Sequence, residues 1–176
     1  MRQKGFLMAD PRTRRQWVLA ALERYEAPLV RYATRLAGDA DSAREAVQHA
    51  FLQLCQHAPE ELEGREAPWL FRVCRNKALD LVRLRQRHTG DGPADLAALA
   101  GREPDPAMAA ERQDLAGELG RLLAQLPQGQ REAIDLWCEG FSYRQISQIA
   151  GQSEGNVRVL VHRGIKRLRE CFGVTK

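Results

Sequence analysis

The sequence has no long hydrophobic run, only 6% aromatic residues and only four cysteines, and each shortage excludes a class of protein. No apolar stretch approaches the roughly 18 residues that a membrane-spanning helix needs. The first 15 residues lack the apolar core of a secretory signal peptide. The cysteines form no CxxC pair and no metal-ligand spacing. We therefore expect a cytoplasmic protein in a reducing setting, with its cysteines as small core residues and with no metal or cofactor.

Lysine is also scarce, so arginine carries almost all the positive charge. The net charge is +4, with 27 basic residues, of which the lysines are only those at positions 4, 77, 166 and 176. Arginine suits bidentate contacts with phosphate and guanine, although a GC-rich genome would give the same bias. A pI near 9.1 permits an anionic partner without requiring one. No nucleophile, paired acid or metal cluster indicates catalysis, so we do not expect an enzyme.

The spacing of apolar residues predicts helices throughout the first half of the chain. A helix is expected from Pro11, which would also make Met8 a plausible alternative start. We expect Pro28 to begin a second helix that closes at Gly38. Asp41 or Ser42 should cap the next helix, which carries a regular apolar stripe. That stripe comprises Ala43, Ala46, Val47, Ala50, Phe51 and Leu54.

An acidic loop, residues 57–67, precedes a helix that we expect Pro68 to open. Leu70, Val73, Cys74, Ala78 and Leu81 are expected to face a core. The other side carries a basic surface formed by Arg72, Arg75, Asn76, Lys77, Arg83, Arg85 and Arg87. Its last arginines can simply complement the helix dipole. The inner ones, beside Trp69 and Phe71, would suit unstacked single-stranded bases.

A stretch rich in Gly, Pro and Asp then interrupts the helical pattern. Residues 88–105 hold four acidic residues against one arginine. Composition alone favours a passive flexible linker. Helix is expected to restart at Asp105 and Pro106, with leucines along one side, and to end at Pro127. A further helix from Arg131 to Cys138 carries Ile134, Leu136 and Trp137.

Two short helices near the C-terminus match the helix-turn-helix signature. Ser142 and Gln145 make a capping box at the start of the first helix. Gly151 ends that helix, and Ser153 caps the second. An apolar seam follows at Val157, Val161, Gly164 and Leu168. An αα-hairpin whose basic face is merely solvated remains a competing interpretation.

At this point the chain resembles a known family. DSAREAVQHAFLQL followed by PWLFRVCRNKALDLVRLRQR is similar to the second-region domain of bacterial sigma factors of the extracytoplasmic-function (ECF) class. LPQGQREAIDLWCEGFSYRQISQIAGQSEGNVRVLVHRGIKRLRE resembles their fourth-region domain. The two motifs occur in the expected order and the resemblance covers about nine-tenths of the chain.

The resemblance implies an all-α protein with two small helical domains joined by a flexible linker. The second-region domain would span residues 10–87, the linker 88–105 and the fourth-region domain 106–173. Such a factor joins core RNA polymerase and directs it to promoter DNA. An anti-sigma protein, which often holds members of the family inactive, is a further candidate partner.

The resemblance also implies roles for individual residues. The residues implied to dock on the polymerase clamp are Glu45, Gln48, His49 and Gln53. The residues implied to contact the melted strand of the downstream promoter element are Arg72, Arg75, Asn76 and Arg83. The residues implied to contact the upstream element as duplex are Ser153, Glu154, Asn156, Arg158, His162 and Arg163. The chain departs from the family pattern at His49, Cys55 and Leu160, of which Leu160 can instead join the apolar seam.

Two other functions remain open at this stage. An autonomous regulator would use the same helix-turn-helix without polymerase, but it has no use for the strand-capturing surface between residues 68 and 87. A helical interaction module would use its basic faces to bind acidic protein partners, and would bind duplex DNA without promoter preference.

Overall fold

The computed structural model describes residues 11–89 and 120–171, and all regular structure in these ranges is helical. The first part contains α1 (Pro11–Ala37), α2 (Ala40–Leu54), the short 3-10 helix η1 (Pro59–Glu61) and α3 (Glu66–Thr89). The second contains a helical end at residues 120–124, then α5 (Gln128–Cys138), α6 (Tyr143–Ala150) and α7 (Glu154–Cys171). The all-α prediction is confirmed. The expectations for most of the linker and for residues 106–119 lie outside the described residues.

The first three long helices form a bundle because each buries one apolar face against the other two. The predicted stripe of α2 is buried throughout. From α3, Leu70, Cys74 and Ala78 enter the same core, together with Val82, which the sequence analysis did not select. The bundle therefore has the buried faces that helical spacing predicts.

Three predicted helix boundaries in this bundle were wrong. Pro28 lies inside α1 instead of opening a second helix, because Leu29, Ala33 and Leu36 continue the buried face beyond it. The cap of α2 is Asp39, whose carboxylate accepts a hydrogen bond from the Ser42 backbone N–H at 2.7 Å. Helix α3 begins at Glu66, so Pro68 lies in its first turn, where a missing N–H costs little.

The second part packs α5, α6 and α7 around a smaller core. Ile146, Ile149, Val157 and Val161 are buried there, as the predicted seam requires, and Leu168 is half-buried. Leu160 is also partly buried against this core, which confirms its predicted place in the seam. Trp137 is 45% exposed, because its side of α5 faces solvent, whereas Ile134 and Leu136 are buried.

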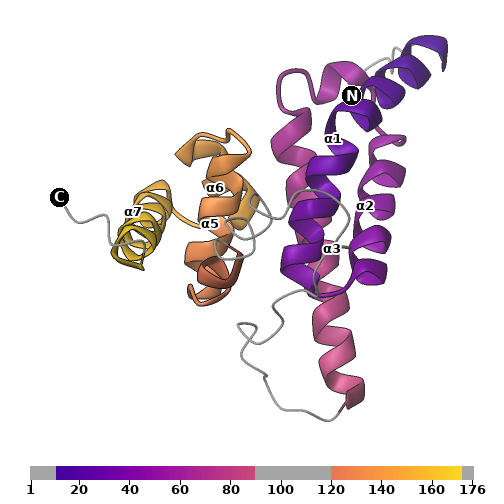
Figure 1. Ribbon diagram of the computed structural model, residues 1–176. Helices are drawn as coiled ribbons and strands as arrows, with labels where there is room; N and C mark the ends of the chain where they lie inside the picture. Colours follow the sequence, from indigo (N-terminus) through magenta and orange to yellow (C-terminus); the bar gives the residue numbers. More distant parts are fainter. Residues whose placement is uncertain (1–10, 90–119, 172–176) are drawn as a thin grey trace, which may run out of the picture.

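The two parts contact each other through α5 and α6. In Figure 1 these helices lie between the bundle and α7, so that α7 is on the side away from α1 and α3. A row of three aromatic rings crosses the junction. The Tyr32 and Phe71 ring centroids are 5.3 Å apart, and those of Phe71 and Phe141 are 4.8 Å apart. Phe71 is therefore covered by protein on both sides.

The expectation that all four cysteines are core residues was wrong. Only Cys74 is buried; Cys55, Cys138 and Cys171 are exposed near the ends of their helices. Burial raises the pKa of the Cys74 thiol to about 12. Within residues 11–89 and 120–171, no three His, Cys, Asp or Glu side chains gather as a metal site would require. Among the helices described, none combines the length and apolar character of a membrane span.

The close approach of α5 and α7 depends on Gly164. A Cβ at this position would lie 2.4 Å from Ile134 Cδ1 and 3.2 Å from Ile134 Cγ1. We expect Gly164→Ala to destabilise the protein by up to about 2 kcal/mol, because an overpacking cost of about 1–3 kcal/mol outweighs the roughly 1 kcal/mol gained in helix propensity. Thermal or denaturant unfolding measures this difference.

The matched control is Gly155→Ala, in the same helix. Nothing lies within 4 Å of the Cβ that this change adds, so it should be neutral or stabilising. Adding Ile134→Val, which removes Cδ1, should recover part of the loss caused by Gly164→Ala. Equal stabilisation by both glycine substitutions would show that the helices can separate without cost.

Candidate nucleic-acid interface

The outer face of α7 is exposed along its N-terminal half. All six predicted duplex-contacting residues are exposed there: Ser153, Glu154, Asn156, Arg158, His162 and Arg163. The buried Val157, Val161 and Gly164 alternate with them at helical spacing and hold the helix against α5 and α6. The structure therefore brings the predicted set together on one projecting helix.

The turn before α7 fixes the direction of this helix. Ser142 and Gln145 form the predicted capping box at the start of α6. Gly151 ends α6 in the left-handed conformation, with φ of 67°. The Ser153 hydroxyl accepts a hydrogen bond from the Asn156 backbone N–H at 3.2 Å, which caps α7. Ser142 and Ser153 thus each cap the start of one of the two helices, and Gly151 ends the first.

Several side chains on this face are held by local contacts. Arg158 lies over the Tyr143 ring, 5.4 Å from its centroid, and 3.5 Å from the Glu154 carboxylate. The Asn156 side-chain amide donates to Gln152 Oε1 at 2.8 Å. These exposed contacts are weak and exchangeable with water or with a ligand. Arginine and asparagine are also the side chains best suited to guanine and adenine edges in a major groove.

On α3 the predicted residues divide between two surfaces. Arg72, Asn76 and Arg83 are exposed and share one face, because spacings of four and seven residues return to the same side of a helix. Arg83 also pairs with Asp80 at 3.0 Å. Arg85, placed on the basic surface by the sequence analysis, instead reaches the carboxylate of Asp39 and the Ala37 carbonyl, so it joins α3 to the start of α2.

Arg75 lies apart from that exposed face. Its guanidinium contacts the Glu132 carboxylate of α5, with Nε 2.5 Å from Oε1 and Nη2 3.2 Å from Oε2. Phe71, which we expected beside unstacked bases, is buried between Tyr32 and Phe141. That expectation was wrong for Phe71. Trp69 is only partly buried and stands edge-on to His57, with ring centroids 4.9 Å apart.

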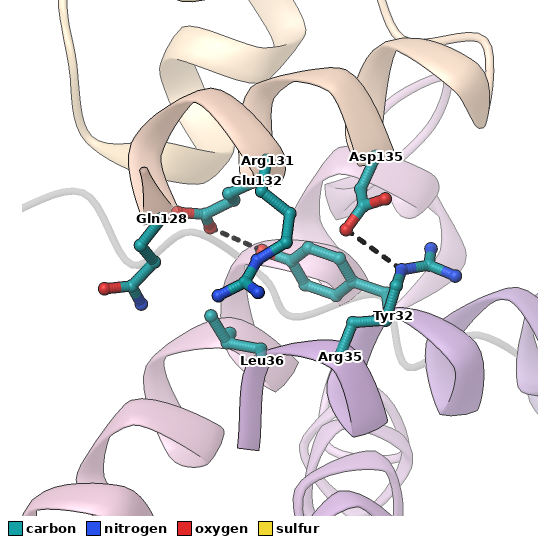
Figure 2. A pocket seen from close by; sticks show the side chains of 7 residues that line it. All are labelled: Tyr32, Arg35, Leu36, Gln128, Arg131, Glu132 and Asp135. Atoms are coloured by element: carbon teal, nitrogen blue, oxygen red, sulfur yellow. Dashed lines mark hydrogen bonds and ion pairs between the residues drawn. The ribbon is translucent and has the colours of Figure 1, made fainter. Parts of the chain in front are cut away.

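Charged side chains fill the junction between α1 and α5 (Figure 2). The Tyr32 hydroxyl donates to Glu132 Oε1 at 2.7 Å, and Arg35 Nε lies 2.9 Å from Asp135 Oδ2. A residual cavity of about 10 Å³ among these side chains is too small for a ligand. The junction is therefore a packed protein contact.

Burial changes the acidity of the groups at this junction. Burial raises the pKa of Tyr32 well above its usual value, so the hydroxyl keeps its proton and can donate to Glu132. Burial also raises the pKa of Asp135, although Arg35 acts in the opposite direction. For Arg75, burial acts to lower the pKa but Glu132 holds it above the usual value. Arg75 and Tyr32 are therefore a cation and a neutral donor facing one carboxylate.

The residues expected at the polymerase clamp lie on the outside of α2. Glu45 and Gln48 are exposed, and His49 and Gln53 are half-buried. Glu45 Oε1 is 2.8 Å from Lys77 Nζ of α3. Gln48 instead lines a groove between α1 and α2 with a volume of about 360 Å³. The apolar part of the groove includes Leu52, which is 57% exposed and was not selected from the sequence.

The sequence analysis also missed the acidic face of α5. Arg131, Glu132 and Asp135 are each less than a tenth exposed, although charged residues in a short helix suggest a solvated face. One signal was available: the acids at positions 132, 135 and 139 recur at intervals of three and four residues, which places them on one face. Nothing local indicated that arginines of α1 and α3 would cover that face.

Comparison with known families gives two matches, one in each half of the chain. Residues 21–88 match the family described as Sigma-70 region 2. Residues 116–168 match the family described as Sigma-70, region 4. The first match covers α2, α3 and most of α1, and the second covers α5, α6 and most of α7.

Curated relatives match across both halves. The ECF RNA polymerase sigma factor SigL of Mycobacterium tuberculosis is 33% identical over 165 residues, 89% of this chain and 91% of SigL. The ECF RNA polymerase sigma factor SigE of Mycolicibacterium smegmatis is 32% identical over 80% of this chain, which spans 55% of SigE. The RNA polymerase sigma factor CarQ of Myxococcus xanthus is 32% identical over 81% of each chain.

Two solved structures share the fold. The sigma factor RpoE in complex with the anti-sigma factor NepR from Bartonella quintana has a TM-score of 0.66 and 25% identity, covering 92% of this chain and 98% of that one. CnrH in complex with the cytosolic domain of CnrY has a TM-score of 0.61 over 92% of this chain and 91% of CnrH. At 22% identity, CnrH supports the fold alone.

The raised pKa of Asp135 predicts a change in stability with pH. The folded chain binds the proton of Asp135 more tightly than the unfolded chain does. This group therefore adds to the free energy of unfolding below its usual pKa, and the addition is lost as pH rises through its raised pKa. Asp135→Asn has no such titration. Its melting temperature relative to that of the original chain should therefore be higher at about pH 7 than at about pH 4.

Asp80→Asn is the matched control, because Asp80 is exposed and pairs only locally with Arg83 among the contacts described. Thermal melts of the three proteins across this pH range make the comparison. If the melting temperature of Asp135→Asn minus that of the original chain stays constant or falls as pH rises, the buried site described for this carboxyl is contradicted.

Proposed function

Because this chain belongs to the ECF class of RNA polymerase sigma factors, it acts in promoter-specific initiation of transcription, and we propose that its two halves hold different forms of promoter DNA. The observation that carries the proposal is the presence of two separate polar faces in one chain. One is the projecting face of α7, and the other is the exposed face of α3. Helices α7 and α3 lie on opposite sides of α5 and α6 (Figure 1).

We assign duplex recognition at the upstream element to α7. Its N-terminal half is exposed, capped and rigidly braced by Val157 and Val161, as a helix entering a major groove must be. Arg158 and Asn156 supply side chains that can make paired hydrogen bonds with bases. His162 and Arg163 extend the same polar surface toward the DNA backbone.

We assign capture of the melted downstream strand to α3. Arg72, Asn76 and Arg83 provide an exposed polar row, and arginine can contact both phosphate and the face of an unstacked base. Arg75 belongs to this assignment only when it is free of Glu132. Trp69, which is partly buried and packs against His57, lies at the start of the same helix.

We assign core polymerase binding to the outside of α2. Glu45, Gln48, His49 and Gln53 form its polar side, and the exposed Leu52 adds an apolar contact beside Gln48. An exposed apolar residue surrounded by polar ones is a common feature of protein interfaces. The partners are therefore core RNA polymerase and promoter DNA.

Two further assignments follow from this role. The protein acts by differential binding and not as a catalyst, and its place of action is the cytoplasm, where the polymerase and the promoters are. The Bartonella quintana neighbour is described in complex with an anti-sigma factor, and we extend that kind of partner to this chain.

The function is tested by adding the purified chain to core polymerase and mapping where transcription starts. We expect initiation at a defined set of promoters only when both are present, because each polar face alone is small. Promoter duplexes should bind the assembled enzyme much more tightly than the free chain. Tight, sequence-specific binding by the free chain would instead favour an autonomous regulator.

The variant Glu45→Arg with Gln48→Ala tests the surface of α2 assigned to polymerase binding. Both residues are exposed, so helix content should not change, and loss of the exposed Glu45–Lys77 pair should lower the melting temperature only slightly. Association with core polymerase should weaken, because the variant alters charge and hydrogen bonding on the assigned surface. Undiminished association would remove this side of α2 from the interface.

The division between α7 and α3 is tested with two promoters, one fully duplex and one carrying a pre-opened bubble. Arg158→Ala should impair initiation on both, by about the 1–3 kcal/mol typical of a paired base contact. Asn76→Ala should impair initiation on the duplex and recover substantially on the bubble, because opening is then supplied. Equal rescue of the two variants, or rescue of neither, would contradict the division.

A further inference from the structure

Val159 is an apolar residue at the centre of the outer face of α7. It is 42% exposed, whereas Val157 and Val161, two residues before and after it, are buried. Two residues turn a helix by about 200°, so Val159 lies on the side of α7 opposite the buried seam. The side chain of Val159 therefore faces away from α5 and α6, toward whatever approaches α7 from outside.

The neighbours of Val159 on this face are polar residues already assigned to duplex DNA. Asn156 lies three residues before it, and His162 and Arg163 lie three and four residues after it, spacings that make neighbours on one side of a helix. Gly155, four residues before Val159, has no side chain, and a Cβ there would meet nothing within 4 Å. A duplex that contacts the polar residues must therefore also meet Val159.

The isopropyl side chain of Val159 limits which part of a duplex it can accept. It has no donor or acceptor for a phosphate or for the polar edges of guanine, adenine and cytosine, and covering such groups without hydrogen bonds is costly. The C5 methyl of thymine is the major-groove group that apolar side chains contact. Thymine is therefore the base whose edge fits this side chain.

We propose that Val159 is a specificity-determining residue of α7, which selects a thymine in the upstream promoter element by contact with the C5 methyl group. The proposal rests on the function proposed above, in which α7 enters the major groove. Asn156 on one side of Val159 is assigned to a base edge, and Arg163 on the other side to the DNA backbone. Val159 adds discrimination in two ways, because a methyl group is buried when thymine is present and a polar edge is covered when it is absent.

Valine at this exposed position does not help the helix to form. Its β-branched side chain loses rotamer freedom in a helix, and alanine, lysine and arginine have higher helix propensity. Val159→Ala should therefore leave the free energy of unfolding unchanged or slightly increased, which denaturant unfolding measures. The variant then separates contact with DNA from folding.

The experiment uses the full chain assembled with core polymerase and a duplex promoter found by mapping start sites. Each thymine of the upstream element is replaced in turn by deoxyuridine, which lacks the C5 methyl and keeps the same base pairing. At one position we expect the replacement to weaken binding about fourfold, the effect of losing one buried methyl-sized group. The replacement removes only the group that Val159 is proposed to contact.

The same promoters are then bound to polymerase assembled with Val159→Ala. This variant should bind the unmodified promoter about fourfold more weakly, and deoxyuridine at the sensitive position should have little further effect, because both changes remove the same contact. Leu19→Ala is the matched control, since Leu19 is an apolar residue of α1 that is 47% exposed. With Leu19→Ala the fourfold effect of deoxyuridine should be retained in full.

Selection from duplexes randomised in the upstream element gives a second reading. The original chain should enrich thymine at one position, and Val159→Ala should lose that preference and keep the others. No preference for thymine, or an effect of deoxyuridine that is the same with both proteins, would show that Val159 does not select thymine. Weaker transcription by Val159→Ala with unchanged promoter binding would place Val159 on a protein partner and would also overturn the proposal.

Failure of the proposed function gives a different result. If the chain and core polymerase show no promoter-specific initiation, or if Arg158→Ala and Val159→Ala both bind the promoter as well as the original chain does, duplex recognition by α7 and the role of Val159 are both wrong. If Arg158→Ala weakens binding and deoxyuridine has no effect at any thymine, α7 still recognises duplex and only the role of Val159 is wrong.

Discussion

Helix α3 must present three different faces, and the arrangement of the whole molecule depends on this constraint. One face packs Leu70, Cys74 and Ala78 into the bundle with α1 and α2. A second face meets the fourth-region part through Phe71 and Arg75. Only the third, with Arg72, Asn76 and Arg83, remains in solvent. Two of the three faces of α3 are buried, so only the third is accessible to the DNA strand proposed to bind there.

Helical periodicity predicts the parts of the structure in which one helix buries one apolar face. The stripe of α2, the capping box at Ser142 and the left-handed turn at Gly151 depend on neighbours in sequence, and each was predicted. The predicted boundaries at Pro28 and at Asp41 or Ser42 were wrong, because tertiary burial continues α1 through the proline and because Asp39, earlier in the chain, supplies the cap of α2. Local rules describe what each segment prefers, and packing chooses among those preferences.

The candidate site was predictable to the same extent. Exposed residues of α7 follow from the seam on its opposite face, and the structure places all of them in solvent. Phe71 and Arg75 could not be placed correctly, because their neighbours are Phe141 and Glu132, more than 55 residues further along the chain. A basic and aromatic stretch favours a nucleic-acid surface in isolation, but the same residues also fit an acidic partner from within the chain.

The junction combines apolar and charged contacts, and the two have different consequences. The rings of Tyr32, Phe71 and Phe141 bury apolar area without strong dependence on direction. The carboxylates of α5 tolerate only an alignment that gives each one its arginine, because an unpaired buried charge is costly. The apolar row can therefore favour contact, while the charges select one register for it. Since DNA is itself a polyanion, the ligand proposed for Arg75 would compete with Glu132 for the same cation. If a melted strand contacts Arg75 as proposed, that contact and the pairing of Arg75 with Glu132 exclude each other on electrostatic grounds.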